Sequence, residues 1–315
     1  MKPQKAHRPA PRPHAPPAPH TARTHAPRPP APRPAPHRPT APPPAAKPPL
    51  PAGKAPPTAW DDVAAWYDAL VGETGSEYHR EVVLPGVLKL LVPQPTESVL
   101  DVACGQGVLC RILNQQGVKV TGVDSAAELV RLARQRSEPG IAYHVGDARE
   151  LPFLRDATFD AAACVLAIQN IHPVEGVFLN AARVLRPGGR FVVVMMHPCF
   201  RGPKFSSWGW EASKTQYRRV DRYLLPRKEP IFTHPGQKTG EYTWTFHRPL
   251  QMYFRAIRAA GMLVDALEEW PSHKMSEPGP RAAAENTARK EIPMFLALRA
   301  IRGEMKPQMN ADKRR

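Results

Sequence analysis

The sequence predicts an α/β fold built on a doubly wound, mostly parallel sheet of seven strands. Short apolar segments alternate with segments of helical apolar spacing between about residues 98 and 196. Such alternation is typical of a parallel sheet with helices on both faces. Residues 159–168 are almost wholly apolar, as expected for a strand that is covered on both faces.

The predicted elements follow a regular order along this region. Two helices, over 58–71 and 82–91, precede the first strand. Strands are expected over 98–103, 119–123, 141–145, 159–168 and 191–196, with helices over 108–116, from Ser125 onward and over 174–185. Glu128 follows Ser125 by three residues, which predicts a reciprocal capping box at the start of that helix.

The end of the chain departs from this alternation. A helix over 250–260 and a strand over 263–267 are followed by a polar segment, 271–292, without a clear crossover helix. The last strand, over 293–301, is therefore expected to run antiparallel. Residues 198–247 hold ten of the 23 aromatic residues, and we interpret them as an insert after the fifth strand that caps the mouth of the sheet. The alternative is a small subdomain whose aromatic residues form its own core.

Composition separates a body from two basic ends. Residues 1–57 contain 22 of the 40 prolines and ten Lys or Arg but no acidic residue, which predicts a disordered tail. The body, 58–301, is then one domain of ordinary length. Residues 302–315 form a second basic tail. The net charge of +16 lies mainly in these ends, because the body has 29 basic and 26 acidic residues. Any attraction to a polyanion such as nucleic acid would thus act through a tether.

The cysteines and the apolar segments restrict the compartment. The four cysteines form no Cys-x-x-Cys pair and no zinc spacing, so neither a metal site nor a disulfide framework is expected. No apolar run reaches the roughly 20 residues that a membrane span requires. The tail also lacks the apolar core of a secretory signal. We expect a cytoplasmic protein.

Acidic residues and glycines gather where the predicted strands end. The first strand runs into Asp101-Val102-Ala103-Cys104-Gly105-Gln106-Gly107, in which two glycines allow a tight turn and close approach of a ligand. Asp124 ends the second strand, where a carboxylate can accept hydrogen bonds from ribose hydroxyls. Asp147 follows the third strand, where an acid could bind an adenine amino group. Ligands of doubly wound sheets bind at this edge. No third glycine follows, which disfavours a dinucleotide fingerprint.

These segments together resemble the class I S-adenosylmethionine-dependent methyltransferases, which have a Rossmann-like fold. The likeness rests on five motifs in order: 99–107, 122–124, 146–153, 159–171 and the turn Arg183-Val184-Leu185-Arg186-Pro187-Gly188-Gly189-Arg190. It covers roughly residues 60–301. Ala103 stands where many members have glycine.

The resemblance implies a cofactor, S-adenosylmethionine, and residues that bind it. Gly105 and Gly107 would lie along the methionine part, beside Ala103, and Asp101 would organise the amino-acid end. Asp124 would bind the ribose. The remaining implied contacts are Asp147 and Ala148 at the adenine, Leu166 beyond the fourth strand, and Tyr67 on the N-terminal helix.

Transfer of a methyl group from a sulfonium needs no proton on the leaving group, so no catalytic residue is obligatory. A general base is needed only if the acceptor must lose a proton. His172 and His197 follow the fourth and fifth strands and are the candidates. Each also fits an ordinary structural role, His172 before a helix and His197 bonded to the backbone.

The sequence leaves the methyl acceptor open. A small-molecule acceptor is our first hypothesis, because aromatic residues of the insert suit an apolar ligand. The alternatives are an RNA or protein methyltransferase tethered by the basic tail, a cofactor-binding scaffold without turnover, and a nicotinamide-binding Rossmann domain.

Overall fold

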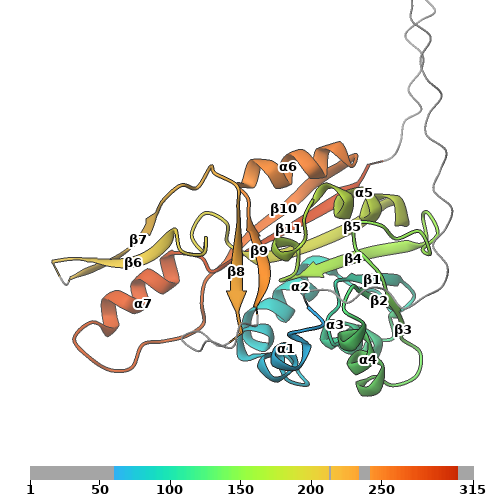
Figure 1. Cartoon of the computed structure of the whole chain (residues 1–315), viewed down its shortest axis with the longest axis horizontal. Helices are drawn as coiled ribbons and strands as arrows, with labels where there is room; N and C mark the ends of the chain where they lie inside the picture. Colours follow the sequence, from blue (N-terminus) through green and yellow to red (C-terminus); the bar gives the residue numbers. More distant parts are fainter. Residues whose placement is uncertain (1–59, 213, 234–241, 304–315) are drawn as a thin grey trace, which may run out of the picture. The chain divides into compact units, whose positions relative to one another are not determined.

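The centre of the fold is a seven-stranded sheet (Figure 1). The computed structural model describes residues 60–212, 214–233 and 242–303. The strands are β1 (Ser98–Val102), β2 (Lys119–Asp124), β3 (Ala142–Val145), β4 (Phe159–Val165), β5 (Leu185–Met196), β10 (Met262–Trp270) and β11 (Phe295–Arg302). Their order is β10-β11-β5-β4-β1-β2-β3. β11 runs antiparallel to β5 and β10, whereas the other neighbouring pairs are parallel. The predicted sheet with its antiparallel last strand is confirmed.

Helices cover both faces of the sheet, as a doubly wound fold requires. They are α1 (Ala64–Val71), α2 (Leu84–Leu91), α3 (Val108–Gln115), α4 (Ala127–Arg136), α5 (Glu175–Val184) and α6 (Leu250–Ala259). Figure 1 shows α5 and α6 on one side of the sheet and α3 and α4 on the other. The two hydrophobic cores agree with this view. Phe178 of α5 and Tyr253 of α6 lie in one core, and Leu91 of α2 and Leu113 of α3 lie in the other.

The residues of β4 show how one strand serves both cores. Successive side chains of a strand point to opposite faces. Ala162 and Cys164 lie in the core beside α5, whereas Ala161 and Ala163 lie in the core beside α2. None of the four side chains has exposed surface. The strand is continuously apolar in sequence because both of its faces are buried.

The helical segments before β1 differ from the prediction. The first helix begins at Ala64, after turns at residues 60–63, rather than at Thr58. The second segment starts as a π-helix, η1 (His79–Val83), and continues into α2. Isolated π-turns are rare and frequently occur at functional sites.

The capping box predicted at Ser125 and Glu128 is wrong. α4 begins two residues after Ser125 and has no hydrogen bond from a capping side chain. Asp124 Oδ1 instead accepts from the amide that follows Ser125 (2.9 Å), and Asp61 Oδ1 accepts from the amide of Glu128 (3.2 Å). The Glu128 carboxylate pairs with Arg131. Acids from outside the helix therefore do the capping.

The polar segment 271–292 contains a helix, α7 (Ala282–Glu291), that the prediction missed. Ala288 is its one buried residue, so the segment has no apolar stripe that helical spacing could reveal. Figure 1 shows α7 beside the insert rather than against the main sheet. α7 therefore does not act as a crossover helix between parallel strands, and β11 runs antiparallel to β10 as predicted.

The insert forms two hairpins. β6 (Ser206–Glu211) pairs with β7 (Thr215–Val220), and β8 (Arg227–Phe232) pairs with β9 (Tyr242–His247). The first hairpin lies beside α7 (Figure 1). The second lies against η2 (Ile168–Asn170), the 3-10 turn after β4, where Thr245 Oγ1 donates to Gln169 O (3.4 Å). The second hairpin therefore lies at the carboxyl edge of β4.

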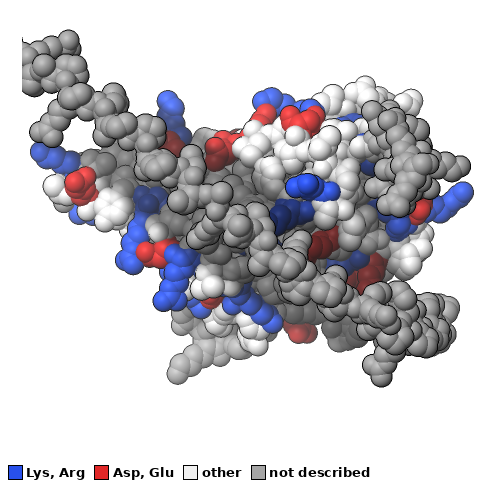
Figure 2. All heavy atoms as spheres, turned by 90° about the horizontal axis from the view of Figure 1, so that it is seen from above, with Lys and Arg blue, Asp and Glu red and all other residues white. Residues whose placement is uncertain are grey.

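The predicted tail 1–57 and nearly all of the predicted tail 302–315 lie outside the described residues. On the face shown in Figure 2, Lys and Arg side chains are interspersed with Asp and Glu, in keeping with the nearly balanced charge of the body. Among the described helices, none has the length and apolar character needed to cross a membrane.

Arg190 of β5 connects the sheet to the end of α2. Its guanidinium forms a bidentate pair with Glu97, at 2.9 and 2.5 Å. It also donates to the carbonyl oxygens of Leu91 and Val92. Both charged side chains are mostly buried, with 16% and 19% of their surface exposed. The hydrogen bonds from Arg190 lower the pKa of Glu97.

We expect Arg190→Met to lower the free energy of unfolding by about 2–4 kcal/mol, because it leaves a partly buried carboxylate and two carbonyl groups without their donor. Arg186→Met is the matched control. This variant removes the ion pair between Arg186 and Asp160, in which the Arg186 side chain is half exposed. The free energy of unfolding should therefore fall by less than about 1 kcal/mol. Urea denaturation of both variants measures the difference, and equal losses would contradict this assignment.

Candidate functional site

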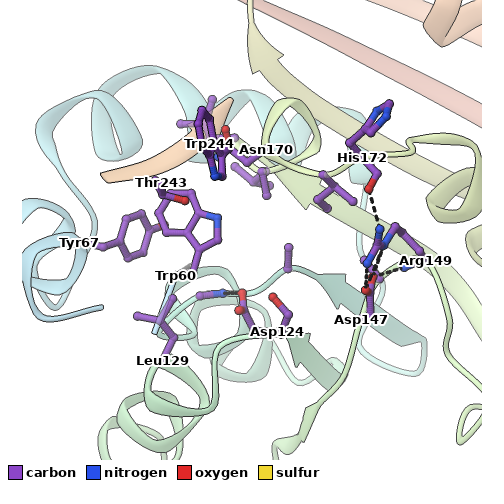
Figure 3. A pocket seen from close by; sticks show the side chains of 18 of the residues that line it. Trp60, Tyr67, Asp124, Leu129, Asp147, Arg149, Asn170, His172, Thr243 and Trp244 are labelled. Carbon is purple, nitrogen blue, oxygen red and sulfur yellow. Dashed lines mark hydrogen bonds and ion pairs between the residues drawn. The ribbon is translucent and has the colours of Figure 1, made fainter. Parts of the chain in front are cut away.

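A cavity of about 300 Å³ lies beyond the carboxyl ends of β1 to β4 (Figure 3). Parallel strands present their carboxyl ends on one edge, where doubly wound sheets bind ligands. Most of the predicted site residues line it: Tyr67, Ala103, Gly105, Asp124, Asp147, Ala148, Leu166 and His172. Asp101, Gly107 and His197 do not line this cavity.

The loop after β1 contains three residues in the left-handed backbone region. Ala103, Gly105 and Gly107 have φ values of 58°, 54° and 85°. A side chain at Gly105 would lie 3.2 Å from the Tyr67 ring, so glycine there leaves the cavity open. A side chain at Gly107 would collide with the Tyr143 hydroxyl. Gly107 therefore allows the loop to pack against β3 and does not reach the ligand side.

Asp124 joins this loop to the start of α4. Its Oδ2 accepts from the Gly105 amide (2.8 Å), and its Oδ1 accepts from the Ala126 amide (2.9 Å). The residue is 7% exposed and faces the cavity. Burial raises the pKa of Asp124, although both amide hydrogen bonds lower it. The carboxylate thus shapes the glycine loop and still lines the cavity.

Asp101 lines a second, smaller cavity of about 30 Å³, which also borders on Tyr67 and Ala103. The residue is 2% exposed, and Cys110 Sγ donates to its Oδ2 (3.2 Å). Burial raises the pKa of Asp101 to about 7, while the hydrogen bond from Cys110 lowers it. Burial and the nearby Asp124 and Asp101 raise the pKa of Tyr67 as well.

Asp147 is paired with Arg149, a residue to which sequence reasoning gave no role. Its carboxylate accepts from the Arg149 amide (2.8 Å) and forms an ion pair with the guanidinium (2.5 Å). Burial opposes ionisation of Asp147, but these bonds outweigh it and lower the pKa. Arg149 Nη1 also donates to the His172 carbonyl oxygen (2.6 Å). An adenine amino group would therefore share Asp147 with Arg149.

His197, a predicted general base, lies away from the cavity. It is 1% exposed, and both ring nitrogens have partners. Nδ1 accepts from the Cys199 amide (3.2 Å), and Nε2 bonds to Glu269 Oε1 of β10 (2.7 Å). This geometry gives His197 a structural role at the end of β5.

His172 lines the cavity, but its hydrogen bonds do not suit a base. Its ring stacks on Phe246, with centroids 5.0 Å apart. Nδ1 lies 3.2 Å from Arg248 Nη2. A guanidinium only donates, so Nδ1 accepts and Nε2 bears the proton of the neutral ring. The Nδ1 lone pair of His172 is therefore engaged by Arg248 and is not open to a ligand.

Several lining residues were not among the predicted cofactor-binding or catalytic residues. They are Trp60 before α1, Asn170 after β4, and three residues of β9, namely Thr243, Trp244 and Phe246. Figure 3 shows Trp244 and Thr243 across the cavity from Asp124. The alternation of Tyr242, Trp244 and Phe246 was a signal for a strand with one aromatic face. Nothing in the sequence indicated that this strand, among those of the insert, would meet the main sheet.

Comparison with known proteins defines the family. Residues 100–193 match the family described as "Methyltransferase domain". A demethylmenaquinone methyltransferase of Tropheryma whipplei is 35% identical over 142 residues, which are 44% of this chain and 54% of the relative. One of Beutenbergia cavernae is 31% identical over 177 residues, 56% of this chain and 69% of the relative. The chain thus spans about half the length of the first and about two thirds of the second.

A solved structure extends the match to most of a whole domain. The S-adenosylmethionine-dependent methyltransferase of Mesorhizobium loti is 27% identical, with a TM-score of 0.55 over 69% of this chain and 96% of that one. The chain belongs to the class I S-adenosylmethionine-dependent methyltransferases. S-adenosylmethionine is the cofactor of this family.

The residues at the main cavity fit this cofactor. The open space at Gly105, which a side chain would fill, allows close approach of a ligand to the backbone. The carboxylates of Asp124 and Asp147 end adjacent strands and face the same cavity. They provide acceptors for hydroxyl and amino groups, and Arg149, the one Lys or Arg among the described lining residues, is paired with Asp147.

We expect Gly105→Ala to weaken binding of S-adenosylhomocysteine about tenfold or more, because the new methyl group enters the space between the loop and Tyr67. Gly188→Ala is the control, since Gly188 has a comparable φ of 77° but open space around it. Both variants should lose roughly 1–2 kcal/mol of stability to backbone strain. Calorimetric titration should show an affinity loss for Gly105→Ala alone; a loss in both would disprove the steric argument.

Proposed function

We propose that the protein is an enzyme that transfers a methyl group from S-adenosylmethionine to a small-molecule acceptor bound against β9. The observation that supports this is the aromatic wall made by Trp244 and Phe246, which line the same cavity as Asp124. Figure 3 shows Trp244 across this cavity from Asp124. Aromatic side chains offer large apolar area and stack on flat ligands. The names of the two curated relatives, demethylmenaquinone methyltransferases, agree with a small acceptor.

In this proposal the carboxyl edge of the sheet binds the cofactor. Asp124 accepts from the ribose hydroxyls, while Asp147 and the backbone at Ala148 bind the adenine. Ala103 and Gly105 lie along the methionine part, and Leu166 contacts the cofactor after β4. Asp101 binds the amino-acid end from the smaller cavity. Gly107 has an indirect role, through its packing against Tyr143.

The bound cofactor supplies an electrophilic methyl group for in-line displacement. A lone pair of the acceptor forms the new bond to carbon while the carbon–sulfur bond breaks, and its electron pair stays on sulfur. The residues of the chain hold the two reactants in line and exclude water. Trp244 and Phe246 fix the plane of the acceptor. A proton released by the acceptor passes to solvent, because neither His172 nor His197 has a free basic nitrogen at the cavity.

A cytoplasmic location is part of this proposal, since the four cysteines are all free thiols as in a reducing compartment. Methylation of RNA or protein with the basic tail as a tether is the competing proposal. It requires that binding depend steeply on salt and on residues 1–57.

The acceptor class is tested with labelled S-adenosylmethionine and a cell extract divided into small-molecule, RNA and protein fractions. We expect label in the small-molecule fraction, with the full chain and with a variant lacking residues 1–57. Label in RNA or protein that disappears on removal of the tail would support the tethered alternative instead.

We expect Trp244→Ala to lower kcat/KM for the acceptor by roughly 10- to 100-fold, with unchanged affinity for S-adenosylhomocysteine. Trp210→Ala is the matched control, because Trp210 lies in the first hairpin and contacts Arg281 (5.0 Å) rather than the cavity. If Trp244→Ala changes cofactor affinity as much as kcat/KM, the aromatic wall does not serve the acceptor.

The raised pKa of Asp101, about 7, predicts a pH dependence. Below this value the free protein holds Asp101 protonated, and an ammonium group then lacks its anionic partner. Affinity for S-adenosylhomocysteine should increase as the pH rises from about 6 to about 8, by at most tenfold per unit, and level off above the pKa. Titration calorimetry across this range should give a flat profile for Asp101→Asn. An equally flat profile for the wild-type protein would show that Asp101 does not bind the ammonium group of the cofactor.

A further inference from the structure

The smaller cavity joins two parts of the chain that lie far apart in the sequence. Asp101, Cys104 and Gln106 line it from β1 and the following loop, and His79 of η1 and Leu84 at the start of α2 line it from the other side. Tyr67, Ala103 and Val165 line both cavities, so the two cavities are adjacent.

His79 is held in place by its surroundings. It is the first residue of the π-helix η1, and its Nδ1 bonds to Ser76 Oγ (2.7 Å). A side chain at Gly75, where φ is 93°, would lie 2.8 Å from His79 Cβ, so the turn before η1 depends on glycine. Burial and the neighbouring Arg80 lower the pKa of His79, which favours the neutral ring.

One nitrogen of this ring has no partner. Among the described residues, Ser76 is the one hydrogen-bond partner of the His79 side chain, and Nε2 is not among the buried polar atoms. If the Ser76 hydroxyl donates to Nδ1, the proton of the neutral ring is on Nε2. His79 then offers one N–H donor at the edge of the smaller cavity.

The described polar side chains of the smaller cavity include a partner for an ammonium group but no cationic partner for a carboxylate group. The amino-acid end of S-adenosylmethionine carries an ammonium and a carboxylate group. Asp101 can accept from the ammonium, but no Lys or Arg lines the smaller cavity within the described chain. The Gln106 amide is held by the protein itself, because Nε2 donates to Gly72 O and Oε1 accepts from Arg111 (2.9 Å). Among the side-chain nitrogens that the structure describes at this cavity, His79 Nε2 is the one without a hydrogen-bond partner.

We propose that His79 Nε2 donates to the carboxylate of the cofactor's amino-acid end, with Ser76 selecting the required tautomer. Asp101 accepts from the ammonium in the same cavity, so the zwitterion meets one acid and one N–H donor. The contact also attaches the segment before α2 to the bound cofactor. This inference rests on the proposed use of S-adenosylmethionine and is independent of the acceptor.

The test compares two ligands that differ in the amino-acid end. S-adenosylhomocysteine carries the amino-acid end, and 5′-methylthioadenosine lacks it. For His79→Ala we expect the affinity for S-adenosylhomocysteine to fall roughly 10- to 100-fold, the usual range for a hydrogen bond to a charged group. Affinity for 5′-methylthioadenosine should not change. His144→Ala is the matched control, since His144 lies on β3, contacts Phe153 and lines neither cavity.

Two further measurements separate binding from structure. Ser76→Ala keeps the ring but not the partner of Nδ1, so it should weaken S-adenosylhomocysteine less than His79→Ala and leave 5′-methylthioadenosine unchanged. In wild-type protein, NMR titration should show a higher His79 pKa with S-adenosylhomocysteine bound, because a carboxylate stabilises the charged ring. Equal weakening of both ligands, or an unchanged His79 pKa, would overturn the proposal. Failure of wild-type protein to bind S-adenosylhomocysteine would instead overturn the proposed function on which it rests.

Discussion

The site depends on the two hydrogen bonds that the Asp124 carboxylate accepts. One comes from the Gly105 amide in the loop after β1, and the other from the Ala126 amide at the start of α4. Because β1 and β2 are neighbouring parallel strands, this single side chain joins the ends of both. The loop that must approach a ligand is thereby held by the acid expected to bind the same ligand. Loss of this carboxylate would disturb the shape of the cavity as well as its chemistry.

The two sides of the cavity have separate origins. The cofactor side comes from strand ends that the family shares, and its polar groups are backbone amides and carboxylates. The opposite side comes from β9, the last strand of the insert, and is mainly aromatic. If β9 binds the acceptor as proposed, a change in β9 alters the choice of acceptor without touching Asp124 or Gly105. This division explains how the family assignment specifies the methyl donor while the acceptor requires experiment.

The sequence predicted the sheet well because its strands are buried on both faces, as Ala161 to Cys164 show. It also located the lining acids, which follow directly from strand ends. It missed α7, which buries a single alanine and so has no apolar stripe. It also predicted a capping box at Ser125 and Glu128, where the amides at the start of α4 instead donate to Asp124 and Asp61. Position in the chain made His197 a candidate base, with a structural role as the alternative, and placed Gly107 along the cofactor. In the structure His197 contacts Glu269, and Gly107 packs against Tyr143. Both partners lie more than 30 residues away in the sequence, so local sequence patterns cannot predict these contacts.

The position of β11 has a consequence for assembly of the molecule. It is the last of the described strands along the chain, yet it lies inside the sheet between β5 and β10. During synthesis, β5 and β10 therefore wait with unpaired edges until residues 295–302 leave the ribosome, and such edges are prone to pair with other chains. The final few residues of the body thus decide when the nascent protein becomes safe from aggregation, although none of them lines either cavity.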